Sequence, residues 1–104
     1  MFFKLLFFIT LLAISILAVL PDYNALPPVV SMSDVINHIL AFFTLSFLFK
    51  LAYPKLKTIL HVFLLSAYGV AIEVVQYFLP TRFGDPYDVL SDILGVLLAL
   101  IFML

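Results

Sequence analysis

The sequence contains no cysteine, which excludes a disulfide framework, a thiolate metal site and a cysteine nucleophile. Charged residues are also scarce. They make up 11% of the 104 residues, whereas hydrophobic residues make up 66% and the mean hydropathy is +1.32. Soluble domains carry about 25% charged residues, so this balance is not that of a water-soluble protein. The composition predicts an integral membrane protein.

Four apolar segments of helical length divide the chain, at about residues 3–20, 34–53, 58–79 and 87–104. A bilayer core about 30 Å thick needs roughly 20 apolar residues per helical span, so four spans leave no room for a soluble domain. Prolines mark the boundaries, at Pro21, Pro54, Pro80 and Pro86. We predict an all-α fold, in which residues 1–104 form one transmembrane domain, an integral membrane four-helix bundle with short connections.

The first segment also resembles a secretory signal peptide, because Lys4 precedes a long apolar stretch. However, Pro21 follows Leu20 directly, without a small-residue cleavage site. We therefore expect this segment to be retained as a membrane helix.

The basic residues predict the orientation of the helices. Lys4 lies at the start of the first segment, and Lys50, Lys55 and Lys57 lie in or beside the second connection, whereas residues 21–33 contain no Lys or Arg. By the positive-inside rule both termini are cytoplasmic, in a bacterial cytoplasmic membrane. Arg82 alone departs from this bias, and all six acidic residues fall in or near the outer half under the same topology.

Polar residues form a stripe on each of the three later segments, at the spacing of three, four or seven residues that shares a helix face. The stripes consist of Asp34 and His38, then Ser66, Gly69, Glu73 and Gln76, then Asp85, Asp88, Asp92 and Gly95. At a rise of about 1.5 Å per residue, His38, Glu73 and Asp92 lie roughly 6 to 10 Å below the outer helix ends. Because isolated charges are costly in hydrocarbon, we expect these side chains to converge.

The expected result is an outward-facing polar pocket between the last three segments. Its candidate residues are Asp34, His38, Glu73, Gln76, Arg82, Asp88 and Asp92. Helix capping is an alternative explanation for Asp34 and is the favoured one for Asp85. We interpret Gly69 and Gly95 as packing positions and expect His61 to lie at the membrane interface.

The same residues resemble the signature of the VanZ-like family of small bacterial membrane proteins. The matching positions are Asp34-x-x-x-His38-x-x-x-Phe42, Glu73-x-x-Gln76, Pro80-x-Arg82, Asp85, Asp88 and Gly95, within residues 34–98. Val35 and Asp92 depart from the family pattern, which usually has Lys and Asn there. The resemblance implies a multispan protein of the cell envelope, whose name-giving member is associated with resistance to the glycopeptide teicoplanin.

Three functions fit these residues. We favour an accessory or binding protein, without assigning catalysis, whose pocket engages a lipid-linked envelope precursor or a lipoglycopeptide. The alternative is an intramembrane hydrolase or transferase in which Asp34, His38, Glu73 and Asp92 hold a divalent cation that acts on a lipid-linked phosphate. A structural or assembly role is the third. We assign no cofactor, expect the lipid bilayer but no nucleic acid as a partner, and leave oligomerisation open.

Overall fold

The computed structural model describes residues 1–19, 34–78 and 86–103. These residues form four α-helices, α1 (Phe2–Val19), α3 (Asp34–Ala52), α4 (Thr58–Phe78) and α5 (Pro86–Phe102), and no strand occurs among them. The predicted all-α, four-helix fold is confirmed. Pro86 occupies the first position of α5, where its missing N–H costs no helical hydrogen bond.

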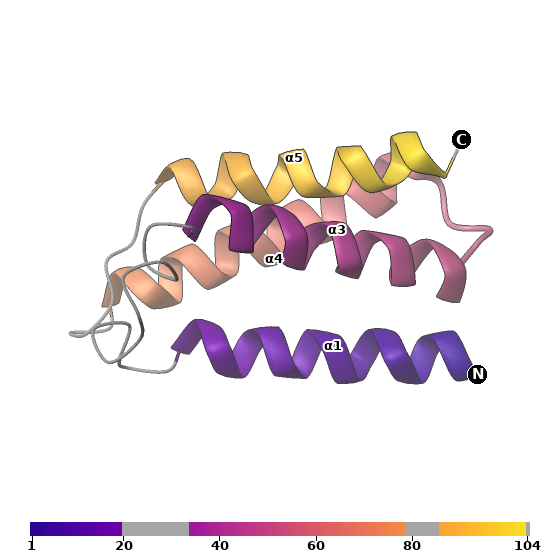
Figure 1. Cartoon of the computed structure of the whole chain (residues 1–104), viewed down its shortest axis with the longest axis horizontal. Helices are drawn as coiled ribbons and strands as arrows, with labels where there is room; N and C mark the ends of the chain where they lie inside the picture. The colour runs from indigo at the N-terminus through magenta and orange to yellow at the C-terminus, as the bar shows by residue number, and fades with distance from the viewer. Residues whose placement is uncertain (20–33, 79–85, 104) are drawn as a thin grey trace.

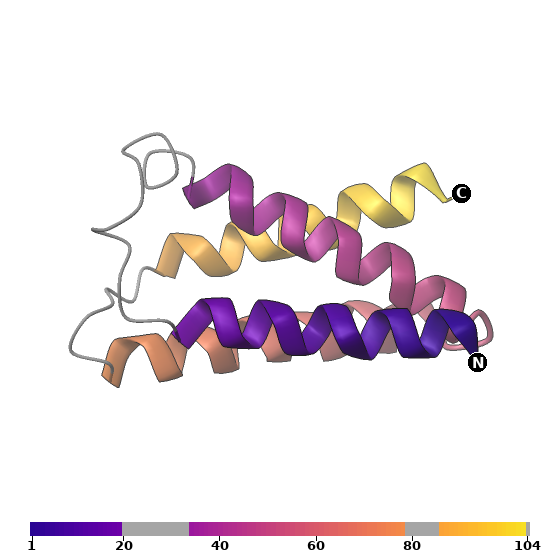
Figure 2. The ribbon, with the colours of Figure 1, turned by 60° about the horizontal axis from the view of Figure 1, so that its bottom comes forward.

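The helices form an elongated bundle that measures 40 × 25 × 25 Å. α3 packs most extensively against α5, α1 packs against α3, and α4 packs against α5, whereas α1 and α4 touch only lightly. The amino terminus, the connection between α3 and α4, and the carboxyl terminus lie at one end (Figure 1). Turning the molecule shows α3 crossing α5 and α1 running alongside α4 (Figure 2).

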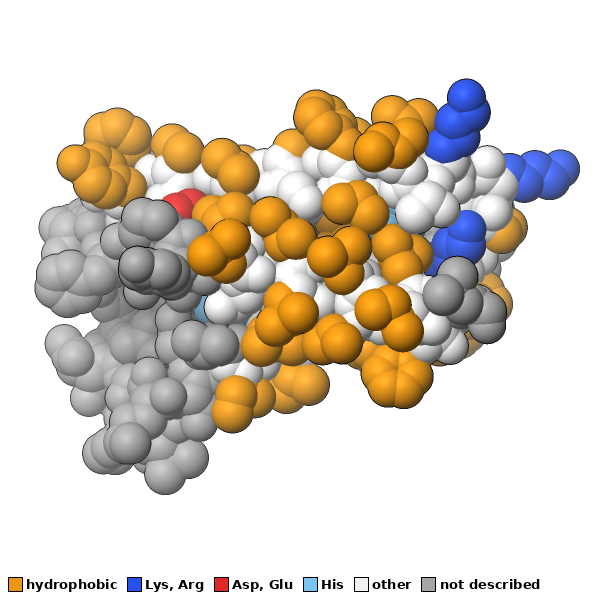
Figure 3. Space-filling model, turned by 90° about the horizontal axis from the view of Figure 1, so that it is seen from above, with side chains coloured by type: hydrophobic (Ala, Val, Ile, Leu, Met, Phe, Trp, Pro, Cys, Tyr) orange, Lys and Arg blue, Asp and Glu red, His pale blue; other side chains and the backbone are white. Residues whose placement is uncertain are grey.

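The outside of the bundle is more apolar than the surface of a soluble protein. Phe63, Phe78 and Phe102 are each at least 65% exposed, and hydrophobic side chains are spread along the face that Figure 3 shows. Soluble monomers rarely expose apolar surface on this scale. α1 and α4 are long and apolar enough to cross a membrane, whereas the apolar parts of α3 and α5, Ile36–Ala52 and Val89–Phe102, are shorter.

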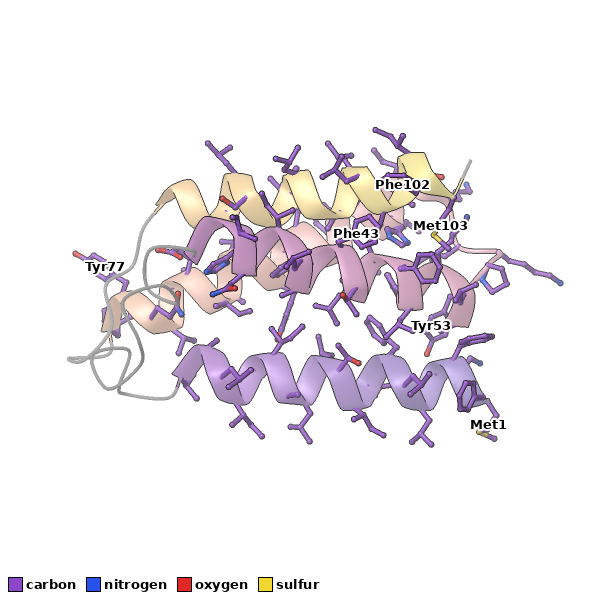
Figure 4. All side chains as sticks on the ribbon, in the orientation of Figure 1. Met1, Phe43, Tyr53, Tyr77, Phe102 and Met103 are labelled. Atoms are coloured by element: carbon purple, nitrogen blue, oxygen red, sulfur yellow. The ribbon has the colours of Figure 1, made fainter. Side chains whose placement is uncertain are left out.

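Aromatic and branched aliphatic side chains fill the interior. Phe7 of α1 stacks on Phe49 of α3 with ring centroids 4.9 Å apart, and Phe42, Leu45 and Val96 are almost completely buried. Phe43 of α3 and Phe102 of α5 also meet, with centroids 5.8 Å apart (Figure 4). The core thus joins α3 to both α1 and α5 and makes α3 the central element of the bundle.

Gly95 allows α3 and α5 to approach each other closely. A Cβ atom added at this position would lie 2.4 Å from the carbonyl oxygen of Ile39 and 3.0 Å from the backbone nitrogen of Phe43. Any side chain here would collide with the backbone of α3. The predicted packing role of Gly95 is therefore confirmed, and the close crossing brings the polar residues one turn away within reach of each other.

Candidate polar site between the helices

His38 and Asp92 form a buried polar pair across the α3–α5 crossing. His38 Nδ1 lies 2.7 Å from Asp92 Oδ1, and the two side chains are 15% and 2% exposed. An ionised carboxylate can only accept a hydrogen bond, so this contact requires a proton on Nδ1 when Asp92 is charged. The pair places an ionisable group from each of two helices within a largely apolar bundle.

Gly69 brings α4 against the same carboxylate. A Cβ atom at this position would lie 2.9 Å from Asp92 Oδ2 and 3.4 Å from Asp92 Cβ. The glycine therefore leaves the space that the Asp92 side chain occupies, and its predicted role as a packing position is confirmed. Together, Gly69 and Gly95 allow three helices to converge around Asp92.

Glu73 lies on α4 one turn beyond Gly69, towards the end of that helix. Four residues correspond to about 6 Å along the axis, so Glu73 belongs to the helix face that carries the contact with Asp92. Its side chain is only partly buried. Of the candidate residues, His38 and Asp92 are thus in direct contact, and Glu73 occupies the adjoining turn of the third helix.

Gln76 is directed towards a different helix. Its side-chain nitrogen donates a hydrogen bond of 3.0 Å to the carbonyl oxygen of Ala18, near the end of α1. The last carbonyl groups of a helix have no partner within it, so Gln76 satisfies one of them. Gln76 is 4% exposed and joins α1 to α4, an interaction that the three-helix interpretation of the sequence did not include.

A second polar contact joins α1 to α4 closer to the middle of the bundle. The hydroxyl groups of Ser15 and Tyr68 are hydrogen-bonded, and Tyr68 also donates to the carbonyl oxygen of Leu11 over 3.3 Å. These hydrogen bonds thus join two helices that otherwise touch only lightly.

Three of the candidate residues have side chains outside the described part of the chain. The backbone of Asp34 begins α3 and Asp88 lies in the first turn of α5, whereas Arg82 falls in residues 79–85. Among the described residues, no group of three His, Cys, Asp or Glu side chains is arranged to hold a metal ion. The divalent-cation hypothesis, which also needs Asp34, remains a prediction.

Sequence reasoning missed a buried pair formed by Ser46 and His61. Ser46 Oγ lies 2.7 Å from His61 Nε2 and donates to the carbonyl oxygen of Val96 over 3.2 Å, so it accepts from a protonated Nε2. His61 is 1% exposed and packs against the Phe49 ring, with centroids 4.9 Å apart. The expectation that His61 lies at the membrane interface did not include this burial, which arises because α4 turns the residue into the bundle.

A signal for this pair was present in the sequence. The buried residues of α4 are His61, Leu65, Gly69, Ile72 and Gln76, which follow one helical stripe. Extending the predicted stripe from Gly69 back by two turns reaches His61. The interfacial interpretation considered only the position of His61 near the expected cytoplasmic end of the segment.

Four apolar helices, of which α1 and α4 are long and apolar enough to cross a membrane, enclose buried polar groups, and this combination suggests a helical membrane protein. The VanZ/LLP1 family model matches residues 1–104 of the sequence. The chain therefore belongs to the VanZ-like family, as the signature residues suggested. No curated protein and no solved structure matches it.

Proposed function

We propose that this VanZ-like protein binds an amphipathic molecule of the bacterial cell envelope at the polar site around His38, Asp92 and Glu73. The contact between His38 and Asp92 carries the proposal, because it concentrates ionisable groups within an apolar bundle. A charge in the middle of a bilayer costs about 2.5–3.5 kcal/mol, and groups retained at that cost commonly serve a ligand or transport pathway.

The charge distribution supports a ligand with a cationic group. All six acidic residues of the sequence lie at Asp22, Asp34 or between positions 73 and 92, and Arg82 is the only basic residue in the same stretches. One arginine balances one carboxylate, and His38 can balance a second when it is protonated. An amino group of a lipid or a lipoglycopeptide would complement the remaining negative charge.

We expect a ligand to reach the site from the end of the bundle opposite the lysines. His38 lies one turn from the start of α3 and retains 15% side-chain exposure. With the lysines on the cytoplasmic side, this end faces outward, where envelope precursors and glycopeptides are present. Because the name-giving member of the family is associated with teicoplanin resistance, this orientation supports a role in glycopeptide tolerance.

A teicoplanin-sensitive bacterium that expresses the protein provides the test. We expect the wild-type protein to raise the minimal inhibitory concentration of teicoplanin, and Asp92→Asn or His38→Phe to remove most of that increase at equal protein level. Thr44→Ala is the matched control, because Thr44 is an exposed polar residue of α3 that bonds only its own helix at Leu40. Full tolerance in both site variants would reject the proposal.

A structural role is the second candidate, since the same pair joins α3 to α5 beside their closest approach. Replacing both partners by apolar residues of similar volume, His38→Phe with Asp92→Leu, separates the two roles. Such a double replacement can be nearly neutral for stability, because neither member of the pair is left buried without the other. A stable double variant without tolerance supports ligand binding, whereas a stable and fully tolerant one supports the structural role.

A further inference from the structure

An apolar cleft of about 380 Å³ opens between α1 and α4. Its wall reaches the α3–α4 connection, at the end of the bundle opposite the start of α3, near which His38 lies. Phe8 and Leu11 line it from α1, Leu64 and Tyr68 line it from α4, and Tyr53 and Leu56 line it from the α3–α4 connection. The cleft exists because α1 and α4 touch only lightly. Its volume falls within the range of roughly 300–1,000 Å³ that is usual for small-ligand sites.

Positive charge gathers at one end of this cleft. The Lys4 ammonium lies 5.0 Å from the centroid of the Tyr53 ring, which is itself part of the wall. Lys55 and Lys57 are exposed and flank Leu56, another wall residue. Tyr53 lies at the same end of the bundle as Met1, and lysines gather at this end (Figures 3 and 4).

The positive charge of these lysines is not balanced by acidic residues in the neighbouring sequence. The segments that build the cleft, residues 1–21 and 35–72, contain no Asp or Glu. An exposed ammonium group near an apolar wall attracts an anion that also carries a hydrocarbon chain, and basic residues at the membrane surface bind anionic head groups in this way.

We propose that the cleft is a binding site for one anionic phospholipid. One acyl chain lies between Phe8 and Leu64, and the phosphate lies among the ammonium groups of Lys4, Lys55 and Lys57. Long lysine side chains extend naturally from apolar surface to the level of the head groups. The site is separate from the His38–Asp92 pair and is independent of the function proposed for it.

The charge pattern favours a lipid over a second copy of the chain as the occupant. Copies inserted in the same orientation would bring their own lysines together at this end, where like charges repel. A phospholipid brings the opposite charge and an apolar chain of suitable shape. A zwitterionic lipid would fill the cleft without using the lysines, so selectivity for the anionic head group is the distinguishing property.

The absence of tryptophan from the sequence makes a direct test available. A Phe8→Trp variant carries its only indole at the cleft, and Val70→Trp carries it on the surface of α4 away from the cleft wall. Phe8 and Val70 are 51% and 46% exposed, so both reporters contact lipid. Each is reconstituted in bilayers in which brominated phosphatidylglycerol or brominated phosphatidylcholine quenches the indole.

At the cleft reporter we expect quenching to show a preference of about 3- to 10-fold for phosphatidylglycerol over phosphatidylcholine, as roughly one favourable lysine contact would give. At the surface reporter we expect the two lipids to quench about equally. Replacing Lys4, Lys55 and Lys57 together by Gln should abolish that preference, and replacing them by Arg should restore it. Equal quenching by both lipids at the two reporters overturns the proposal. So does a cleft reporter shielded from both lipids, which would indicate that a second copy covers the cleft.

Discussion

His38 on α3 and Asp92 on α5 are 54 residues apart in sequence, yet His38 Nδ1 and Asp92 Oδ1 lie 2.7 Å apart. Gly95, one turn from Asp92, leaves room for the α3 backbone, and Gly69 leaves room for the carboxylate itself. The polar contact and the close helix packing therefore depend on one another.

Removal of either partner of this pair should destabilise the protein. Asp92→Ala or His38→Ala leaves the other side chain buried without its main hydrogen bond, which costs about 1–3 kcal/mol. We expect the double variant to lose less than the sum of the single variants, with a coupling free energy of about 0.5–2 kcal/mol. Thermal unfolding in detergent gives the stability of the wild type, the two single variants and the double variant. Strictly additive losses would show that the contact contributes nothing to stability.

The two glycines should differ in their tolerance of an added methyl group. Gly95→Ala places Cβ against the backbone of α3, which cannot move without separating the helices, and we expect a loss of about 2–4 kcal/mol. Gly69→Ala meets the carboxylate of Asp92, which can rotate away, and we expect a loss of about 1 kcal/mol. Unfolding in detergent gives both values. An equal loss at the two positions would contradict the close crossing.

Much of this arrangement could be predicted from the sequence, and the errors have identifiable causes. Counting residues along each helix put His38 and Asp92 at matching depths, because rise per residue is nearly constant in an α-helix. Which helices are neighbours depends on packing over their whole length, and the sequence pattern does not contain that information directly. For this reason the bond from Gln76 to Ala18 of α1 was missed. The burial of His61 was also missed, although the polar stripe of α4, extended towards the start of the helix, indicated it.

The buried pair of Ser46 and His61 should contribute to stability as a unit. Ser46→Ala removes the acceptor for His61 Nε2 and should cost about 1–2 kcal/mol. Adding His61→Leu should recover most of that loss, because no buried donor is then left without a partner. Thr44→Ala, an exposed position on the same helix, should be nearly neutral. If the double variant is less stable than Ser46→Ala alone, the histidine has a packing role independent of the serine.

The hydrogen bonds from α4 to α1 should stabilise the packing of α1 on the bundle. Gln76→Leu frees the carbonyl of Ala18, and Tyr68→Phe removes the bonds to Ser15 and Leu11. We expect hydrogen exchange to accelerate in α1 by about 5- to 10-fold in each variant, equivalent to a loss of about 1 kcal/mol in local stability, with little change in α5.

Tyr77→Phe is the matched control for the tyrosine substitution, because Tyr77 is 73% exposed on the same helix as Tyr68. It should leave the exchange of α1 unchanged. Uniform acceleration across all four helices in the Tyr68→Phe variant would instead mean that this hydroxyl supports the bundle as a whole.

The orientation of the bundle in the membrane decides whether the polar site can meet a ligand from outside the cell. Pro54 lies in the α3–α4 connection just before α4, and Tyr77 lies near the other end of that helix. Both residues are exposed, and the sequence has no native cysteine. We expect a membrane-impermeant maleimide to label Tyr77→Cys in intact cells and Pro54→Cys only after permeabilisation, since three lysines near Pro54 favour the cytoplasmic side. The reverse pattern would place His38 and Asp92 towards the cytoplasm. An external glycopeptide could not then reach them directly, and a ligand made inside the cell would become the better candidate.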